Sequence, residues 1–153
     1  MNQQSVIGGA VRILGLDIGT KRIGVAVSDE LGFTAQGVDT LIRKYTDSDL
    51  EQIIGLVGKY GAEEIVVGVP YNMNGSEGPQ ARKVKELIAQ IAARVRVPVH
   101  EWDERLSTVA AERILLEADL SRAKRRKVID KLAAVIILQG YLDRLHAGGC
   151  SAS

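Results

Sequence analysis

The sequence is poor in cysteine, histidine and aromatic residues. Of its 153 residues one is a cysteine, Cys150, so the chain cannot form an internal disulfide framework, which fits a reducing compartment. Its two histidines, His100 and His146, leave no Cys/His cluster of the kind that binds zinc. One Phe, one Trp and four Tyr provide few rings on which bases could stack. These absences argue against disulfide-stapled and zinc-dependent folds.

Long apolar runs are also absent. No segment approaches the roughly 20 apolar residues of a membrane span, and the first residues, MNQQSVIGGAVR, lack the charged and then apolar layout of a signal peptide. We therefore expect a cytoplasmic protein that does not enter a membrane. A length of 153 residues, 46% hydrophobic and 25% charged, suits one globular domain. We expect this domain over 11–146, between a flexible N-terminus (1–10) and a disordered tail (147–153).

Charge is nearly balanced over the whole chain but not along it. The formal net charge is +1, which by itself favours no class of partner. The stretch SRAKRRKVIDK, residues 121–131, holds six basic residues against one acid. Such a basic patch is the pattern expected for contact with phosphates, that is, for a nucleic-acid partner. The alternative is an ordinary solvated helix entrance.

Five segments have the Val, Ile and Leu enrichment of strands. The first two are separated by IGTK, which supplies a glycine for a turn, so they are expected to form a hairpin. Pro70 ends the fourth segment, because proline cannot donate to a strand ladder. The predicted strands cover residues 11–17, 22–29, 33–42, 63–69 and 97–104.

Helical patterns alternate with the later strands. The sequence SDLE, from Ser48 to Glu51, is a capping-box pattern, and Gly61 is expected to end the helix that it starts. Either Ser107 or Thr108 is expected to cap the third helix. The predicted helices cover 48–60, 80–95, 107–118 and 128–145. This order predicts an α/β fold with a mixed five-stranded sheet, its first three strands antiparallel, and helices on both faces.

Three carboxylates are candidates for a site at one rim of this sheet. Asp17 ends the first strand, within RILGLDIGTKRIGVAVSD, and Glu104 ends the fifth. Both open toward one rim if these strands are parallel and close together, and such rims are where α/β sheets usually meet phosphates. Asp130 falls in the first turn of the last helix, on a small and apolar row that indicates packing against the sheet. The residues in line with it are Ala133, Ala134, Ile137 and Tyr141.

Converging acids of this kind favour a metal site. Three carboxylates at a partly buried rim would repel one another unless a cation lies between them. Hard oxygen ligands select Mg²⁺ or Mn²⁺, and one or two ions are expected. Two ions about 4 Å apart can activate a water and stabilise the leaving oxygen in phosphodiester hydrolysis. We therefore predict that Asp17, Glu104 and Asp130 are metal ligands and catalytic residues.

Each acid taken alone also has an ordinary structural explanation. Asp17 could cap the turn that follows it. Glu104 could pair with Arg105 or favour the start of the next helix, and Asp130 could be a first-turn acid that interacts with the helix dipole. The metal site depends on the three acids lying together, which the sequence implies only through the predicted fold.

Four ordered motifs carry a resemblance to a known family. They are LDIGTKRIGVAVSD, VGVPYNMNGSEG, DERLST and IDKLAAVIIL. Over residues 12 to about 142 the sequence resembles the YqgF family, also called RuvX, which is similar to Holliday junction resolvases of the RuvC type. The resemblance implies a ribonuclease H-like fold and a metal-dependent nuclease. Matched position by position, it also implies catalytic acids at Asp17, Glu104 and Asp130.

The resemblance further implies a substrate. Members of the family are associated with processing the 5′ end of the 16S rRNA precursor in ribosome biogenesis, and earlier descriptions favoured four-way DNA junctions. RuvC-type enzymes use four acids, two of them on the last helix, whereas here the next acid after Asp130 is Asp143, more than three turns on. Asp103 is another candidate for a fourth ligand, but strict alternation sends it to the face opposite Glu104. This departure bears on the second metal more than on the nuclease assignment.

Basic residues near the three acids are candidates for binding substrate. Lys21 and Arg22 lie in the turn after Asp17, where they could touch a backbone phosphate. Arg105, beside Glu104, could do the same or pair with its neighbour. The basic stretch adds further candidates, which are Lys124, Arg125 and Arg126.

The loop PYNMNGSEGP, residues 70–79, adds Asn72 and Asn74 to the substrate-binding candidates. Its polarity and glycines suit a flap that covers a substrate, although long polar loops are often plain surface. Because aromatic rings are scarce, we expect recognition of shape and phosphate rather than base-specific readout.

Two functions of other classes compete with the nuclease. LDIGT also resembles the phosphate-binding hairpin of actin-type and sugar-kinase ATPases, but those proteins need two such domains and a second hairpin, for which this chain is too short. A non-catalytic RNA-binding module would use only the basic stretch at 122–127. Such a module predicts that Asp17→Asn leaves function unchanged.

The sequence thus predicts a nuclease that processes pre-16S rRNA, with Holliday junction resolution as the alternative. Symmetric cutting of a junction requires two sites related by a two-fold axis, and therefore a homodimer, whereas a monomer can trim an RNA end. The expected partner is structured RNA or branched DNA.

Overall fold

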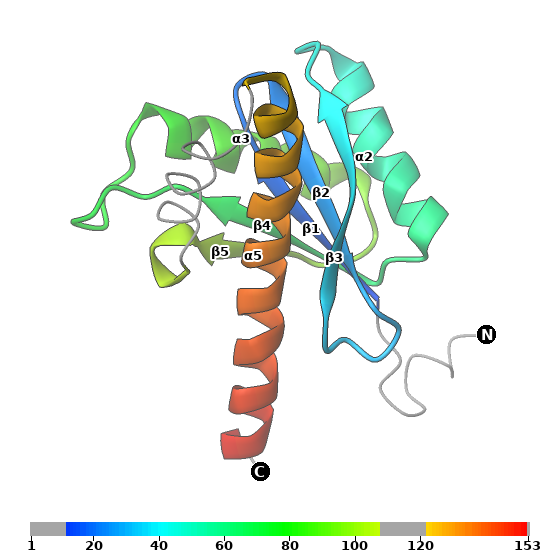
Figure 1. Ribbon diagram of the computed structural model, residues 1–153, viewed down its shortest axis with the longest axis vertical. Coiled ribbons are helices and arrows are strands. Elements are labelled where there is room, and N and C mark those ends of the chain that lie inside the picture. Colours follow the sequence, from blue (N-terminus) through cyan, green and yellow to red (C-terminus); the bar gives the residue numbers. More distant parts are fainter. Residues whose placement is uncertain (1–11, 108–121, 153) are drawn as a thin grey trace.

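The computed structural model describes residues 12–107 and 122–152, and in the second range the side chains of 131–147 (Figure 1). The predicted flexible N-terminus, 1–10, and the predicted helix at 107–118 beyond Ser107 lie outside these residues. Within the described ranges no helix combines the length and apolar character needed to cross a membrane.

A mixed five-stranded sheet forms the centre of the fold. Its strand order is β3-β2-β1-β4-β5. The strands β1, β2 and β3 form an antiparallel meander, and β4 and β5 continue the sheet parallel to β1. Both the number of strands and their directions agree with the prediction. The bounds are β1 (Ile13–Ile18), β2 (Arg22–Ser28), β3 (Ala35–Ile42), β4 (Glu64–Val69) and β5 (Val99–Asp103).

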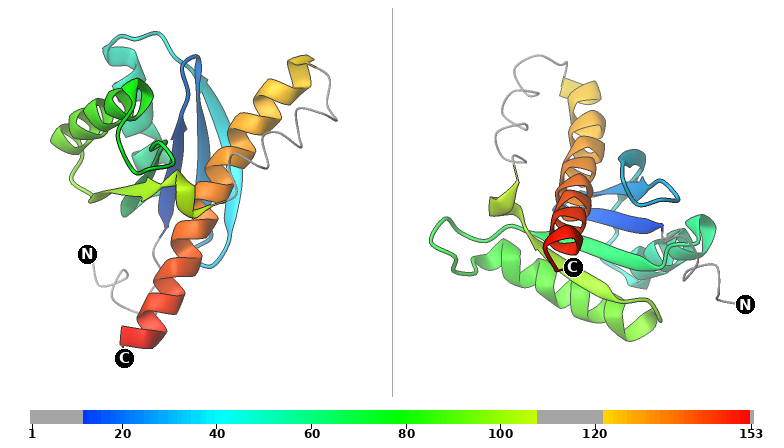
Figure 2. Two further views of the ribbon diagram at one scale, coloured as in Figure 1. Left: turned by 90° about the vertical axis from the view of Figure 1, so that its left-hand side faces the viewer. Right: turned by 90° about the horizontal axis from the view of Figure 1, so that it is seen from below.

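Helices cover both faces of this sheet, as predicted. Figure 2 shows α2 (Asp47–Tyr60) and α3 (Pro79–Arg94) on one face and α5 (Arg122–Ala152) crossing the other. A single turn of 3₁₀ helix, η2 (Glu104–Leu106), follows β5 directly. The carboxyl ends of β1 and β4 and the N-terminal half of α5 therefore lie at the same end of the molecule (Figure 1).

The start of α2 differs from the predicted capping box. Its N-cap is Thr46, whose hydroxyl accepts a hydrogen bond from the Ser48 backbone N–H at 3.3 Å. Ser48 is therefore already inside the helix. The sequence TDSD offers four successive capping residues, and the pattern alone does not choose among them. Gly61 ends the helix with a left-handed backbone, φ 61°, as predicted.

The last helix is longer than predicted at both ends. It begins at Arg122 rather than Val128, so the basic stretch belongs to the helix, which fits the good helix propensity of Lys and Arg. It also continues to Ala152, where a disordered tail was expected from residue 147. No proline follows Leu145, and each further residue in a helix adds a hydrogen bond for one residue fixed.

Two apolar layers hold the helices to the sheet. Leu14, Leu16 and Val67 face the layer under α2 and α3, while Ile13 and Val66 face the layer under α5. Because all six residues of β1 are buried, this strand is covered on both faces. That burial explains the continuous apolar run in its sequence, which only Asp17 interrupts.

Candidate active site

Asp17 lies on the α5 face of the sheet, near the carboxyl end of β1. Alternation along β1 puts Leu16 under α2 and α3, so Asp17 points to the opposite face. Its neighbour across the antiparallel pair is Gly24 of β2. Only 3% of Asp17 is exposed, so this carboxylate lies at the edge of a core rather than on an open turn.

Glu104 reaches the same face from η2. The first residue of that turn is Glu104, directly after the last residue of β5. Its Oε2 would lie 2.8 Å from a Cβ placed on Gly68, a residue of β4. On β1 and β4 the residues that follow the Leu16–Val67 pair are Asp17 and Gly68. The Glu104 carboxylate therefore lies over the strand next to Asp17, as predicted from parallel, neighbouring strand ends.

Asp130 lies on α5 in the described backbone, but its side chain is outside the described set. The position is one turn before Ala134, a fully buried residue whose carbonyl oxygen would be 3.4 Å from a Cβ on Gly15. Ala133, Ala134 and Ile137 are buried against the sheet, so the predicted apolar row is confirmed. Position 130 continues this row toward the end of α5 that lies near the carboxyl end of β1. Its carboxylate stays a predicted third ligand.

The chemistry of the two described acids suits a hard divalent cation. Carboxylate oxygens are the ligands that Mg²⁺ and Mn²⁺ prefer, and Gly68 leaves the space that the Glu104 carboxylate occupies. Among the residues whose side chains are described, no group of three His, Cys, Asp or Glu is arranged around a common point. That search does not include Asp130, so a three-acid site requires its carboxylate.

Arg105, predicted to contact a phosphate or Glu104, forms an ion pair with Asp103 instead. Its Nε and Nη2 lie 3.1 Å and 2.6 Å from Asp103 Oδ2, and its backbone N–H donates to Asp103 Oδ1 at 2.9 Å. The side-chain hydrogen bond from Arg105 lowers the pKa of Asp103, and the same bond raises the pKa of Arg105. Asp103 thus serves as the cap of η2, and its carboxylate is engaged on the side away from the α5 layer.

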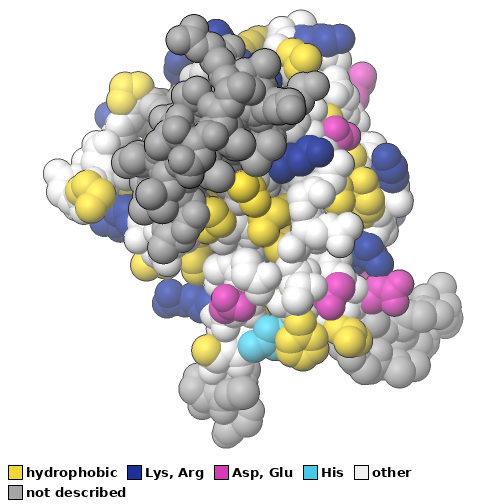
Figure 3. Space-filling model, viewed as in Figure 1, with side chains coloured by type: hydrophobic (Ala, Val, Ile, Leu, Met, Phe, Trp, Pro, Cys, Tyr) yellow, Lys and Arg dark blue, Asp and Glu magenta, His cyan; other side chains and the backbone are white. Residues whose placement is uncertain are grey.

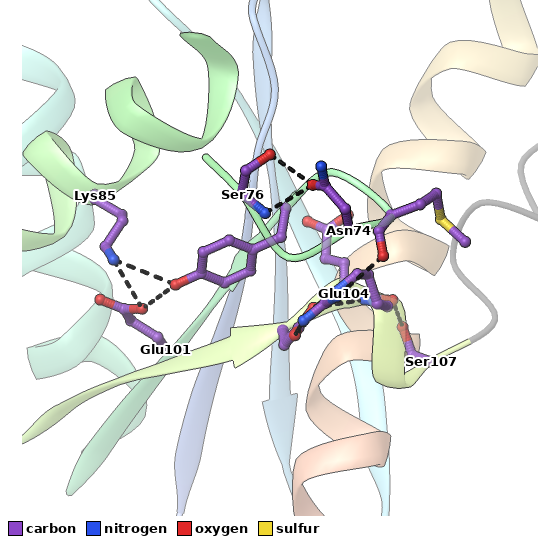
Figure 4. A network of polar contacts seen from close by, with 10 residues as sticks. Asn74, Ser76, Lys85, Glu101, Glu104 and Ser107 are labelled. Atoms are coloured by element: carbon purple, nitrogen blue, oxygen red, sulfur yellow. Dashed lines mark hydrogen bonds and ion pairs between the residues drawn. The ribbon is translucent and has the colours of Figure 1, made fainter. Parts of the chain in front are cut away.

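The β4–α3 loop is tied to the turn that carries Glu104. Arg105 Nη1 donates to the carbonyl of Met73 at 3.2 Å, and a Cβ on Gly75 would lie 3.3 Å from the same nitrogen. Figure 4 shows Asn74 and Ser76 of this loop lying over η2, with Glu104 and Ser107 beneath. The segment predicted as a loop is therefore a structured loop placed over the site.

Hydrogen bonds inside this loop occupy both predicted asparagines. Asn74 Oδ1 accepts from the Ser76 N–H at 3.0 Å and from its hydroxyl at 2.6 Å. Asn72 donates from Nδ2 to Ser76 Oγ at 2.9 Å. Gly75 supports the turn with φ 89°, a value that favours glycine. Asn72 and Asn74 therefore shape the loop, and both remain exposed at its surface.

At the base of the loop, Lys85 joins it to α3 and β5. Its ammonium lies 2.6 Å from Glu77 Oε2. It also lies 3.2 Å from the Tyr71 hydroxyl and 3.8 Å from Glu101 Oε1, as Figure 4 shows. The hydrogen bond to Glu77 is the main reason why the pKa of Lys85 is raised. The loop is thus anchored at both ends.

The predicted cationic contacts fall into two groups. Lys21 is exposed and Arg22 half-buried at the β1–β2 turn, which directly follows the strand of Asp17. Lys124, Arg125 and Arg126 lie in the first turns of α5, where the backbone alone is described. Figure 3 shows Lys and Arg side chains at the upper edge of the face that α5 covers, where the β1–β2 turn lies in Figure 1.

One residue of the site was missing from the sequence prediction. Gly68 gives the Glu104 carboxylate its place, and a glycine inside a buried strand is a recognised sign of close approach by another group. The signal was therefore present in EIVVGV, but the sequence does not say which group approaches.

Comparison with known proteins identifies the family of this chain. The family model RuvX, described as Holliday junction resolvase, matches residues 11–144. A protein of Moorella thermoacetica is 60% identical over 139 residues, which are 91% of this chain and 99% of its own length. One from Halothermothrix orenii is 59% identical over 89% of this chain and 99% of its own. Both carry the name "Putative pre-16S rRNA nuclease".

Solved structures share the fold at low sequence identity. RuvC of T. thermophilus, solved in complex with a Holliday junction substrate, has a TM-score of 0.61 and 14% identity, covering 90% of this chain and 97% of its own. A second structure of RuvC from Thermus thermophilus has a TM-score of 0.51 and 13% identity, covering 89% and 97%. The fold is therefore that of the RuvC-like ribonuclease H group, as the motifs indicated. With a family model that spans most of its length and relatives near 60% identity, this chain belongs to the RuvX family.

Proposed function

We propose that this protein is a metal-dependent endonuclease that hydrolyses phosphodiester bonds and processes the 5′ end of the 16S rRNA precursor. The observation that carries the proposal is the position of Glu104 Oε2 over Gly68, one strand away from the buried Asp17. Two carboxylates of distant sequence origin converge there on one sheet face. Packing alone does not call for such an arrangement, because converging acids repel each other.

In this proposal Asp17, Glu104 and Asp130 hold one or two Mg²⁺ or Mn²⁺ ions. When bound, such an ion would supply an activated water and stabilise negative charge on the leaving oxygen. Asp17 is held rigidly by a strand that is buried on both faces. Glu104 is held by η2, which Asp103 and Arg105 fix through their paired hydrogen bonds. The chain thus presents its acids on rigid elements, as positioning of a reacting phosphate requires.

The relatives support RNA as the substrate. Those of Moorella thermoacetica and Halothermothrix orenii are named as pre-16S rRNA nucleases, and they match nearly the full length of this chain. We therefore place the protein in the cytoplasm, where ribosomes are assembled, with structured RNA as its partner. Lys21, Arg22 and the basic first turns of α5 would contact the phosphate backbone.

Holliday junction resolution is the alternative function. It is favoured by the description of the RuvX family and by the likeness to RuvC at the level of fold. A resolvase must cut two strands symmetrically, and so it would act as a homodimer with two sites related by a two-fold axis. End processing of an RNA requires one site.

The test is cleavage of a 16S precursor RNA fragment and of a four-way DNA junction, side by side, with Mg²⁺ or Mn²⁺. Asp17→Asn and Glu104→Gln remove one charge each without a change in size. Glu51→Gln is the matched control, because Glu51 is an exposed acid on α2, a helix of the opposite sheet face. We expect RNA cleavage by the parent and by Glu51→Gln, none by the other two variants, and none with EDTA.

Each other outcome has a definite meaning. Cleavage by Asp17→Asn at the parental rate would refute the nuclease site. Cleavage of the junction alone would overturn the choice of RNA, and a dimer in solution would then be required. Binding of RNA without cleavage under any metal would support a non-catalytic RNA-binding module.

A further inference from the structure

Tyr45, at the corner between β3 and α2, has an unusual backbone and an exposed ring. Among the described residues other than glycine it alone has a positive φ, 58°. Residues with a Cβ seldom adopt this conformation, and where it persists the surroundings must hold it. The side chain is 64% exposed, so burial of the ring is not the reason.

Asp49 holds this corner from below. Its Oδ1 accepts from the Lys44 N–H at 2.9 Å and its Oδ2 from the Tyr45 N–H at 3.0 Å. Asp49 is 4% exposed and lies 3.6 Å from Arg43 Nε, so a buried charge is committed to the backbone of an exposed residue. These hydrogen bonds thus hold Tyr45 in its positive-φ conformation, with its ring exposed.

The same corner is tied to the turn after Asp17. The Arg43 N–H donates to the Lys21 carbonyl at 2.9 Å, and Arg43 Nη1 donates to the Gly19 carbonyl at 3.1 Å. The Tyr45 hydroxyl donates to the carbonyl of Thr20. These bonds join residues 43–45 to the β1–β2 turn, which follows Asp17 within a few residues. The position of the Tyr45 ring is therefore coupled to the rim of the proposed active site.

One face of the ring is already covered by a cation. The guanidinium carbon of Arg43 lies 4.1 Å from the centre of the Tyr45 ring. Because Arg43 covers one face of the ring and Tyr45 is 64% exposed, we assign the exposure to the other face. An exposed aromatic ring backed by arginine is a surface on which a nucleobase can stack.

A hollow of about 290 Å³ adjoins this ring. Its cations are Lys21, Arg22 and Arg43, and no acid is among its lining residues, which also include Thr20, Ile42 and Tyr45. Arg22 pairs with Ile42 across the strands and stands two residues before Gly24, the partner of Asp17. Arg22 and Ile42 therefore share the sheet face of Asp17. A hollow of this charge favours a phosphate, and its apolar wall favours a base.

The neighbouring hollow has a different character. It measures about 480 Å³ and lies toward α3, with Asp47, Asp49 and Glu86 among its lining residues. These three acids stand against two cations, Arg43 and Lys83, so this hollow favours a polyanion less than the first one does. Tyr45 lines both hollows, so the charge difference gives a bound strand one favourable side of the ring.

We propose that Tyr45, backed by Arg43, stacks one unpaired nucleotide of the substrate beside the scissile phosphate, with Lys21 and Arg22 on the flanking phosphates. This inference rests on the proposed nuclease function and narrows its substrate class. A base inside a duplex is already stacked on both faces and cannot use the ring. The preferred substrate is therefore a nucleic acid with a single-stranded end next to the cleavage position, rather than a continuous duplex.

The test measures binding separately from cleavage. In the Asp17→Asn background, two RNAs are compared that share one duplex, one blunt and the other with a short single-stranded overhang containing 2-aminopurine. The variants are Tyr45→Leu, which removes the ring, and Tyr45→Phe, which keeps it. Phe33→Leu is the matched control, because Phe33 is an exposed aromatic residue, 54% exposed, in the turn between β2 and β3.

Tyr45→Gly keeps the test valid if Tyr45→Leu folds poorly. Glycine adopts a positive φ without strain, so this variant removes the ring while the corner at φ 58° is retained. Thermal unfolding of each variant shows which of them is folded when binding is measured.

We expect Tyr45→Leu and Tyr45→Gly to raise the Kd for the overhang RNA about tenfold, the usual effect of losing one stacked base, and to leave the blunt duplex unchanged. Stacking on Tyr45 should quench 2-aminopurine fluorescence in the parent and in Tyr45→Phe. Phe33→Leu should behave like the parent. An equal loss on both RNAs would refute the subsite, as would binding of the overhang RNA that ignores the loss of the ring. The subsite would also be refuted if an apolar peptide, but not unlabelled RNA, displaced the bound overhang RNA.

Failure of this inference is distinguishable from failure of the proposed function. If Asp17→Asn abolishes cleavage but Tyr45→Leu binds both RNAs like the parent, the nuclease stands and the subsite falls. If no metal supports cleavage but the overhang still requires the ring, the subsite stands and the nuclease falls.

Discussion

Glu104 Oε2 lies over Gly68, where a Cβ would come within 2.8 Å of it. The same Cβ would meet Ile137 Cδ1 of α5 at 2.5 Å. Gly68 therefore makes two contacts possible that any other residue would forbid, one with a proposed ligand and one with the helix that covers the sheet. The absence of a Cβ at Gly68 thus affects both the position of the Glu104 carboxylate and the packing of α5 on the sheet.

Gly68→Ala should damage both. The new methyl group must displace the Glu104 carboxylate and push Ile137, and overpacking of this kind costs about 1–3 kcal/mol of stability. A shift of the carboxylate by about 1 Å should reduce cleavage about a hundredfold. Thermal unfolding and single-turnover cleavage of the precursor RNA measure the two effects.

Gly58→Ala is the matched control for this substitution. Gly58 lies inside α2, and a Cβ there meets nothing within 4 Å. Alanine should stabilise this helix by roughly 0.5–1 kcal/mol and leave cleavage unchanged. Parental activity in Gly68→Ala would contradict the role assigned to the space above Gly68.

The fold was predictable because its signals are local. Alternating β and α patterns, the glycine turn after Ile18 and the left-handed cap at Gly61 each belong to a short stretch of sequence. The placement of Asp17 near the end of β1 and of Glu104 directly after β5 could also be predicted, since the carboxyl ends of parallel strands share one rim. Local pattern and chain order were sufficient for these features.

Other features depend on contacts between distant segments. The sequence offered Glu104 or a phosphate as the partner of Arg105. The structure gives Asp103 instead, and that choice depends on the geometry of η2. Exposed polar character suggested a flap for the β4–α3 loop, but the bond from Arg105 to Met73 that ties it down joins separate elements. Tyr45 has no sequence signal, because its positive φ arises from bonds to Asp49.

Arg105→Ala should loosen the β4–α3 loop. The substitution removes the hydrogen bond to the Met73 carbonyl and the paired bonds to Asp103, which leaves Asp103 without its cation. We expect faster amide hydrogen exchange at Asn72 and Gly75, whose N–H groups donate within the loop. The rate of cleavage should also fall, because η2 then holds the Glu104 side chain less firmly.

Arg105→Lys distinguishes charge from geometry. Lysine keeps the positive charge but cannot bind the two oxygens of Asp103 in a fork. We expect it to resemble Arg105→Ala in hydrogen exchange at the loop. If it instead restores the parental exchange, a point charge is sufficient and the forked contact is not required.

Asp29 should make stability depend on acid pH. Its Oδ1 accepts the Phe33 N–H at 2.7 Å, and this backbone bond is the main reason why the pKa of Asp29 is lowered from 3.8. A carboxyl with a lower pKa in the folded state stabilises the fold above its unfolded pKa, and this contribution is lost as the pH falls through the folded value. Stability should therefore decline below about pH 4.

Asp29→Asn should remove this part of the decline. The amide oxygen can still accept from Phe33, but it carries no proton equilibrium in this range. Urea unfolding at neutral pH and at the acid end measures the difference between parent and variant. Because Asp29 is exposed to solvent, we expect a small effect, and an identical acid slope in both proteins would show that Asp29 does not contribute.

Binding of a divalent cation should raise the melting temperature of the parent. A ligand that binds only the folded state at a hundred times its Kd stabilises that state by about 2.7 kcal/mol. For a chain of this size that corresponds to a shift of roughly 5–10 °C. Asp17→Asn and Glu104→Gln should each lose most of the shift, while Glu51→Gln should keep it. Asp130→Asn tests the third ligand. If this variant shows the same shift as the parent in Mg²⁺ and Mn²⁺, Asp130 is not a metal ligand. Its role would then be the interaction with the helix dipole.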